Sequence, residues 1–361
     1  MKITKQQNKK LIIGAIIIVA VYISLTIYSS LLMSNSRGQA FLNHKNRMDA
    51  TQVDVKYPQP KPEFTEIKVG SYMENIYDLS IADSTFSADL YIWFSWVGDK
   101  DINPGETFQI VGGKIDSKEL SSEHYLDDGR NYQRYKISVT VNKVFDTTRL
   151  SLEDHMLNIY IEDKQHDGAS VNYVVDENSA ISSRVKIPGF KVTKFQEVVK
   201  PHEYKSSFSS PSSNAANRVF SQYALAVSIN RSDFGFYLKI FLPFLLSVSL
   251  GLIVLRLKSE LIDARTGLAG AAFFGVVANA YVVSTFIPSD GGTFGILDIL
   301  NFISLLSVLL IVAVSILSHK LCIEGEETEF TKALDKTVFY SIIIGYSILS
   351  VVLPFCTYLQ K

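Results

Sequence analysis

Five aromatic residues could form a binding site for a positively charged ligand. They are Trp93, Trp96, Tyr125, Tyr173 and Tyr204. Aromatic faces attract an ammonium group by cation–π interaction, so these side chains are candidate walls of a ligand pocket. Trp96 and Tyr173 lie on the apolar side of alternating sequences, where core packing is the simpler interpretation. The candidate ligand-binding residues are Trp93, Tyr125, Tyr173 and Tyr204, with core packing as the alternative for Tyr173.

The polar residues do not predict an enzyme or a metal site. The histidines are scattered without metal-ligand spacing, at positions 44, 124, 155, 166, 202 and 319. The acidic pairs Asp127-Asp128 and Glu162-Asp163 could hold calcium with ligands from elsewhere, although surface turns are the simpler role. The sequence has no glycine-rich nucleotide loop, no Gly-x-Ser-x-Gly and no paired acids with a suitable base. We expect neither catalysis nor a cofactor.

A third set of residues recurs at helical spacing. Steps of three or four residues from Asp263 define one helical face, which carries Gly267, Ala271, Phe274, Ala278, Tyr281 and Thr285. The face joins an acid at one end to a large apolar ring near its middle. Asp263 and Arg265 could instead be a solvated loop pair, and the small residues could serve close helix packing. Asn279, in the same apolar stretch, could line a water path, although a hydrogen bond between helices is the simpler interpretation.

The elements that position these residues divide the 361-residue chain into a polar part and an apolar part. Residues 34–235 are polar with interspersed apolar positions, whereas 236–361 consists largely of long apolar runs. The formal net charge is −1, which gives no indication of nucleic-acid binding. The two cysteines, Cys322 and Cys356, fall near opposite membrane faces in the topology derived below, so we expect no disulfide between them.

Five apolar runs are long enough to cross a bilayer core of about 30 Å. They cover residues 11–33, 236–255, 268–287, 296–318 and 337–359. Residues 1–10 form a basic tail, and positive charge before a first apolar run holds that end in the cytoplasm. The connections after the second and fourth runs are basic and suit the cytoplasm, whereas the link that begins at Pro288 has no Lys or Arg. This pattern predicts a cytoplasmic N-terminus, with residues 34–235 and the C-terminus outside.

Residues 11–33 have a second interpretation, as a cleaved signal peptide. The apolar core of a signal peptide has about 7–15 residues, and this run is longer. No small-x-small cleavage site follows closely. We therefore expect an uncleaved transmembrane anchor.

Residues 65–235 predict an antiparallel β-sandwich. Apolar residues alternate with polar ones in 86–96, 135–142, 157–161, 171–175 and 223–229, and turn sequences separate these runs. Alternation of period two is typical of strands with one buried face, and many short strands favour a sandwich. Residues 34–64, with alternating prolines near their end, predict an extended spacer. The serine-rich segment 205–217 predicts a long loop.

A β-sandwich followed directly by four transmembrane helices resembles the pentameric ligand-gated ion channels, the Cys-loop receptor superfamily, and especially its bacterial members. The clearest match is Arg231–Pro243, with an arginine that ends the last strand, aromatic residues Phe234, Phe236 and Tyr237, and then Pro243. The segment 150–157 stands where the family has a Phe-Pro-Phe-Asp loop, with Ser151 for the proline and Glu153 for the acid. The cysteines of that loop are absent, and the N-terminal anchor is extra.

Residues 263–288 resemble the family's pore-lining second helix, which begins at a charged edge and ends at a proline, and Asp298 fits the helix that follows. The resemblance implies a membrane α+β fold, with a sandwich over 65–235 and a four-helix channel-like domain over 236–361. It also implies a homopentamer in a bacterial plasma membrane, opened by an unidentified small molecule. The face from Asp263 to Thr285 would then line the pore, with acids attracting cations and Phe274 closing the path by dewetting.

The resemblance implies that Glu153, Arg231 and Pro288 couple the sandwich to the pore. Their alternative interpretation is a local ion pair between Glu153 and Arg231. Family pores usually carry hydroxyl groups where this chain has Gly267 and Ala271. That departure supports a second hypothesis, in which a non-conducting membrane sensor or assembly protein reuses the fold.

Overall fold

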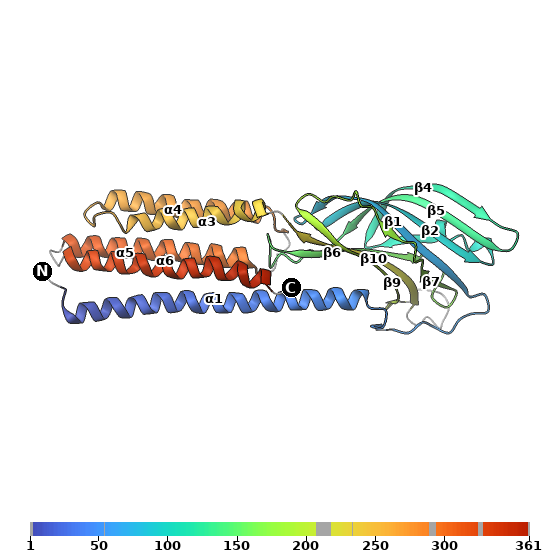
Figure 1. Cartoon of the computed structure of the whole chain (residues 1–361), viewed down its shortest axis with the longest axis horizontal. Coiled ribbons are helices and arrows are strands. Elements are labelled where there is room, and N and C mark those ends of the chain that lie inside the picture. Colours follow the sequence, from blue (N-terminus) through green and yellow to red (C-terminus); the bar gives the residue numbers. More distant parts are fainter. Residues whose placement is uncertain are drawn as a thin grey trace. The chain divides into compact units, whose positions relative to one another are not determined.

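The computed structural model describes residues 3–53, 55–206, 218–232, 234–288, 294–323 and 328–359. The chain forms two compact units (Figure 1). The helical unit comprises Met1–Gln39, Asp146–Glu153 and Asp233–Lys361. The β-unit comprises Ala40–Phe145 and Asp154–Ser232. The segment Asp146–Glu153 thus belongs to the helical unit, although it lies in sequence between two strands of the β-unit.

The β-unit contains two sheets. The larger has the order β4-β5-β2-β1-β7, with β8 also paired to β1. Its strands are β1 (Thr65–Ser80), β2 (Thr85–Val97), β4 (Gly113–Tyr125), β5 (Arg130–Asn142), β7 (Val171–Val175) and β8 (Ala180–Ile181). The smaller has the order β3-β6-β10-β9, with β3 (Phe108–Val111), β6 (Asp154–Asp163), β9 (Phe190–Tyr204) and β10 (Arg218–Arg231). A short helical stretch, η1 (Lys100–Ile102) and α2 (Pro104–Thr107), precedes β3.

The predicted alternation is confirmed in this unit. Along β2 the even-numbered residues from Phe86 to Trp96 are all buried. They join Ile137 and Val139 of β5, Ile159 of β6 and Leu225 of β10 in one core cluster to which both sheets contribute. Because successive side chains of a strand point to opposite faces, a strict period of two gives each sheet one apolar face to bury.

The helical unit contains α1 (Lys5–Met48) as far as Gln39, together with α3 (Phe234–Val254), α4 (Ile262–Ser284), α5 (Ile296–Ile323) and α6 (Thr328–Leu359). By length and composition each could cross a membrane, and the five agree with the five predicted runs. The chain is therefore a multi-pass membrane protein. Helix α4 packs against both α3 and α5, and α5 packs against α6 (Figure 1).

Helix α1 is longer than the predicted anchor. It continues to Met48, so the first half of the segment expected to be an extended spacer is helical, and that prediction is wrong for residues 34–48. The run 34–48 contains no proline, and its polar residues can continue a helix after the apolar stretch ends. Lys200 of β9 donates to the carbonyls of Asn46 (2.6 Å) and Gln52 (2.9 Å). The Asn46 carbonyl lies in the last turn of α1, so the lysine satisfies a group that the end of the helix leaves without a partner.

Tyr22 anchors α1 to the other helices of its unit. Its ring lies so close to Gly345 of α6 that a Cβ there would approach the ring to 2.4 Å. Its hydroxyl forms a 2.5 Å hydrogen bond with Ser307 of α5. Such fitted contacts are those of a packed membrane helix. The uncleaved anchor stays a prediction.

Candidate ion pathway and coupling site

Helix α4 has one buried and one exposed face. The buried residues are Arg265, Ala269, Ala272, Val276, Asn279 and Val283. All the residues predicted to line a pore are exposed on the single chain: Asp263, Gly267, Ala271, Phe274, Ala278, Tyr281 and Thr285. Phe274 and Tyr281 are 70% and 74% exposed. The predicted face is therefore the surface of α4 that is open to lipid or to other subunits.

The buried face explains part of the small-residue content of α4. A Cβ on Gly275 would lie 2.5 Å from the Ser247 hydroxyl, so α3 and α4 approach closely at this point. Asn279 donates to the Ile240 carbonyl at 3.1 Å, which is the predicted hydrogen bond between helices. By contrast, nothing lies within 4 Å of a Cβ added to Gly267. Close packing within the chain thus explains Gly275 but not Gly267.

A buried ion pair holds the end of α4 that carries Asp263. Arg265 is fully buried and its guanidinium pairs with Asp335 of α6. Arg265 also donates to the Leu257 carbonyl at 2.5 Å, and Asp335 accepts from the Ser318 hydroxyl at 2.7 Å. A buried charge is tolerated only with a partner and further hydrogen bonds, and both are present. The alternative of a solvated Asp263–Arg265 loop pair is therefore wrong, because Arg265 points into the unit.

The segment 146–153 contacts the start of α5. The N–H of Ile296 donates to the Thr148 carbonyl at 2.9 Å. Asp298 accepts from the N–H of Gly295 at 2.8 Å, which caps the helix. A Cβ on Gly295 would lie 2.6 Å from the Thr148 oxygen, so glycine is required for this approach. The sequence placed coupling at Pro288, and the contact observed in the helical unit lies further along, at Gly295–Ile296.

Backbone geometry explains why Ser151 replaces the expected proline. Ser151 has a φ of 82°, in the left-handed region. The proline ring fixes φ near −65°, so proline cannot occupy this conformation. The left-handed turn at Ser151 therefore excludes the proline that the resemblance implied at this position.

Replacing Gly295 with Ala should weaken the contact between segment 146–153 and α5. The new Cβ would force Thr148 away and stretch its hydrogen bond with Ile296. We expect a loss of about 1–3 kcal/mol, typical of overpacking, seen as a lower melting temperature of the detergent-solubilised protein. Gly267→Ala is the matched control, because it meets no neighbour and should stabilise α4 by up to about 1 kcal/mol. Equal melting temperatures for the two variants would contradict the contact.

The other two coupling residues fall in different units. Glu153 ends the segment that belongs to the helical unit, whereas Arg231 ends β10 in the β-unit. The Arg231 guanidinium lies over the Phe190 ring, 4.2 Å from its centre. The interaction of Glu153 with Arg231 stays a prediction.

The four predicted ligand-binding aromatics do not form one cluster within the chain. Tyr173 is almost fully buried in the core beside Phe94, so its predicted role as a pocket wall is wrong. Trp93 donates to the Asp176 carboxylate at 2.9 Å. Tyr125 is exposed and donates to Glu123 at 3.1 Å. Trp96, which was expected in the core, is buried there.

Tyr204 belongs to a polar cluster on the smaller sheet that the sequence analysis missed. Its hydroxyl donates to the buried Glu162 carboxylate at 2.8 Å, and Gln222 donates to the same carboxylate at 2.6 Å. His202 also bonds Glu162, through a short contact. This hydrogen bond raises the pKa of His202 above its usual value. The signal in the sequence was an acid at the end of an apolar strand, but its partners come from strands about 40–60 residues later.

The His202–Glu162 bond should make stability depend on pH. A histidine whose pKa is raised on folding contributes stability below about pH 6.5 and loses it as pH rises through the folded pKa. The melting temperature of the wild type should therefore fall relative to His202→Gln between about pH 6 and pH 8. His124→Gln is the control, because that exposed ring bonds the neutral Ser122 hydroxyl. Parallel pH profiles for wild type and His202→Gln would contradict the prediction.

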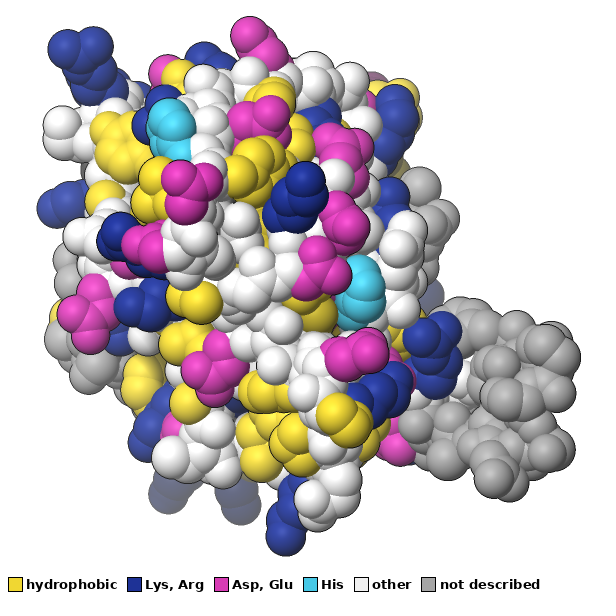
Figure 2. Space-filling view, turned by 90° about the vertical axis from the view of Figure 1, so that its right-hand side faces the viewer, with side chains coloured by type: hydrophobic (Ala, Val, Ile, Leu, Met, Phe, Trp, Pro, Cys, Tyr) yellow, Lys and Arg dark blue, Asp and Glu magenta, His cyan; other side chains and the backbone are white. Residues whose placement is uncertain are grey.

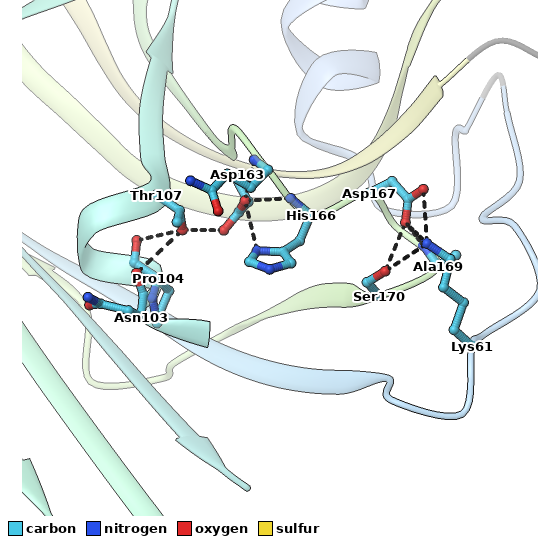
Figure 3. A network of polar contacts seen from close by, with 10 residues as sticks. Lys61, Asn103, Pro104, Thr107, Asp163, His166, Asp167, Ala169 and Ser170 are labelled. Carbon is cyan, nitrogen blue, oxygen red and sulfur yellow. Dashed lines mark hydrogen bonds and ion pairs between the residues drawn. The ribbon is translucent and has the colours of Figure 1, made fainter. Parts of the chain in front are cut away.

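Asp163, next to Glu162, is bound by protein donors rather than poised for calcium (Figure 3). It accepts from the Thr107 hydroxyl at 2.5 Å and from the N–H groups of Gln165 and His166 at 2.7 Å. Glu162 and Asp163 are buried, so the expected surface turn is wrong for this pair. In the same network Asp167 pairs with Lys61 at 3.2 Å. Among the described residues, no group of three or more acids, histidines or cysteines could hold a metal.

Acidic and basic side chains are interspersed on the visible face of the β-unit (Figure 2). No single sign of charge dominates this view, in keeping with the net charge of −1. Bulk charge therefore gives this face no preference for an anionic or a cationic partner.

No protein-family profile matches the chain, and no curated protein matches its sequence.

Proposed function

We propose that the chain is a subunit of a homopentameric ligand-gated ion channel that prefers cations. In this proposal the two sheets form a β-sandwich outside the cytoplasm, α3 to α6 form a four-helix transmembrane bundle, and α1 is an added anchor. The main support for this proposal is that every predicted pore residue of α4 is exposed, whereas the opposite face of α4 is buried against α3 and α5. Five copies of that exposed face around an axis would enclose a path.

Each part of the face has a physical role in the proposed path. A ring of Asp263 would concentrate cations and repel anions at one mouth. Phe274 is the large, purely apolar side chain of the face, so a ring of it would close the path by expelling water. Thr285 and Tyr281 would give the other end polar groups.

Gating would act through the loop that contacts α5. Ligand binding in the β-unit would move segment 146–153, and its bond to Ile296 would carry the movement to α5 and α4. Glu153, Arg231 and Pro288 are the other proposed coupling residues. A small-molecule ligand can drive such a change only by binding the open form more tightly than the closed form.

The alternative is a non-conducting membrane sensor or assembly protein with the same fold. This alternative is supported by the part of the α4 face near Asp263. Gly267 and Ala271 lie there and would provide no hydroxyl groups to line an ion path.

Conductance of the purified protein in planar bilayers separates the two functions. A channel gives discrete current steps that an empty bilayer lacks. Repeated incorporation without current, across a panel of small amines and other candidate ligands, would favour the non-conducting function.

A further inference from the structure

A cavity of about 580 Å³ lies where the turn between α3 and α4 faces the adjoining ends of α5 and α6. It is lined by residues 255–260 together with Cys322, Thr331, Lys332, Asp335 and Lys336. All of these belong to the helical unit.

The described residues that line this cavity carry a net positive charge. It contains four cationic side chains, Arg256, Lys258, Lys332 and Lys336, and two acids, Glu260 and Asp335. Asp335 is already neutralised by the buried Arg265. Lys332 pairs with Glu329 at the surface, whereas Lys258 and Lys336 have no ion-pair partner in the described part of the chain. The described lining therefore favours an anion.

The position of Arg256 suits a phosphate. Its guanidinium lies over the Phe339 ring, 5.0 Å from the centre. Stacking on a ring holds the plane of the group and leaves its N–H edge available for hydrogen bonds to an anion. Arginine with lysines is the usual combination for binding phosphate oxygens.

An apolar groove adjoins the cavity along α3 and α6. This second cavity, of about 410 Å³, is lined by Leu245, Val248, Ser249, Leu252, Ile253, Phe339, Ile343, Tyr346 and Ser347. Leu252 and Ile253 lie near the C-terminal end of α3, about one turn before Arg256, and Phe339 lines the groove while packing under Arg256. A basic cavity beside an apolar groove matches a charged head joined to an acyl chain, because Arg256 of the cavity packs on Phe339 of the groove.

We propose that this site binds an anionic phospholipid, with the phosphate in the basic cavity and an acyl chain in the α3–α6 groove. A basic cavity between helices at the lysine-rich end of a membrane protein is the expected place for such a headgroup. A free phosphate would use the cavity but not the groove. Binding of the phospholipid at this site does not depend on whether the protein conducts ions. The proposed topology enters only in placing the site in the cytoplasmic leaflet.

Residues that line the cavity also take part in the contacts that fix the position of α4. The turn that lines the cavity supplies the Leu257 carbonyl to Arg265, and Asp335 lies at the cavity wall. A bound headgroup would therefore steady the end of α4 that carries Asp263.

Native mass spectrometry of the full chain in detergent tests this proposal with phosphatidylglycerol and phosphatidylcholine of identical acyl chains. We expect selective retention of phosphatidylglycerol. Lys258→Gln and Lys336→Gln should each weaken that binding roughly fivefold. Lys239→Gln, an exposed lysine at the far end of α3, is the matched control and should have no effect.

Two further measurements identify the source of the phosphate. Ile343→Trp should fill the groove and weaken phosphatidylglycerol binding, and inorganic phosphate should compete poorly. Equal binding of both lipids, or no effect of the two lysine substitutions, would overturn the site. Strong competition by inorganic phosphate together with an inert Ile343→Trp would overturn the lipid and leave a free-phosphate site.

Discussion

Replacing Arg265 with Met is expected to destabilise the helical unit by about 3–5 kcal/mol, the usual cost of removing one partner from a buried ion pair. Asp335 would remain buried without its cation, and the Leu257 carbonyl would lose its donor. The prediction is measured as a large drop in the melting temperature of the solubilised protein and a smaller yield of folded protein.

The double variant Arg265→Met/Asp335→Leu separates the pair from mere loss of side-chain volume. Replacing both members of a buried pair by apolar residues is often close to neutral. The double variant should therefore recover most of the stability that either single variant loses. A double variant less stable than both single variants, or an Arg265→Met protein as stable as the wild type, would show that the pair does not hold α4.

Replacing Phe274 with Ser should raise the current that flows without ligand by about tenfold or more. A polar side chain at the proposed constriction lets water persist where the ring expels it, so the closed path conducts. The measurement is the open fraction of single channels in a bilayer with no ligand added.

Phe302→Ser is the matched control for this substitution. Phe302 is also a largely exposed phenylalanine of a membrane helix, but it lies on α5. It should leave the resting current unchanged. If both variants leak equally, or if neither does, Phe274 is not the constriction.

Local sequence patterns predicted the elements of this fold well. The even-numbered residues of β2 are buried because strand geometry alone decides which face each side chain takes. The exposed face of α4 follows in the same way from helical spacing at Asp263 and Phe274. The prediction of an extended spacer was wrong for residues 34–48. The prolines that indicate extended chain lie only near the far end of the segment, and the residues before them continue α1.

The partners of isolated polar residues could not be predicted, because they come from distant parts of the chain. Arg265 meets Asp335 seventy residues later, and the pairing depends on how α4 and α6 pack. Glu162 meets His202 only because β6, β10 and β9 are neighbours in the sheet. The turn at Ser151 was equally hidden, since a serine with positive φ has no distinctive local sequence signal.

The reversal potential of the current under a salt gradient, measured for the wild type and for Asp263→Lys, tests most directly whether the exposed face of α4 lines a cation path. The wild type should reverse near the equilibrium potential of the cation. Asp263→Lys should move the reversal potential to zero or to the anion side, because a ring of lysines repels cations where the acids attract them. A conducting protein whose reversal potential is unchanged by this substitution would place the path elsewhere and contradict the proposed pore.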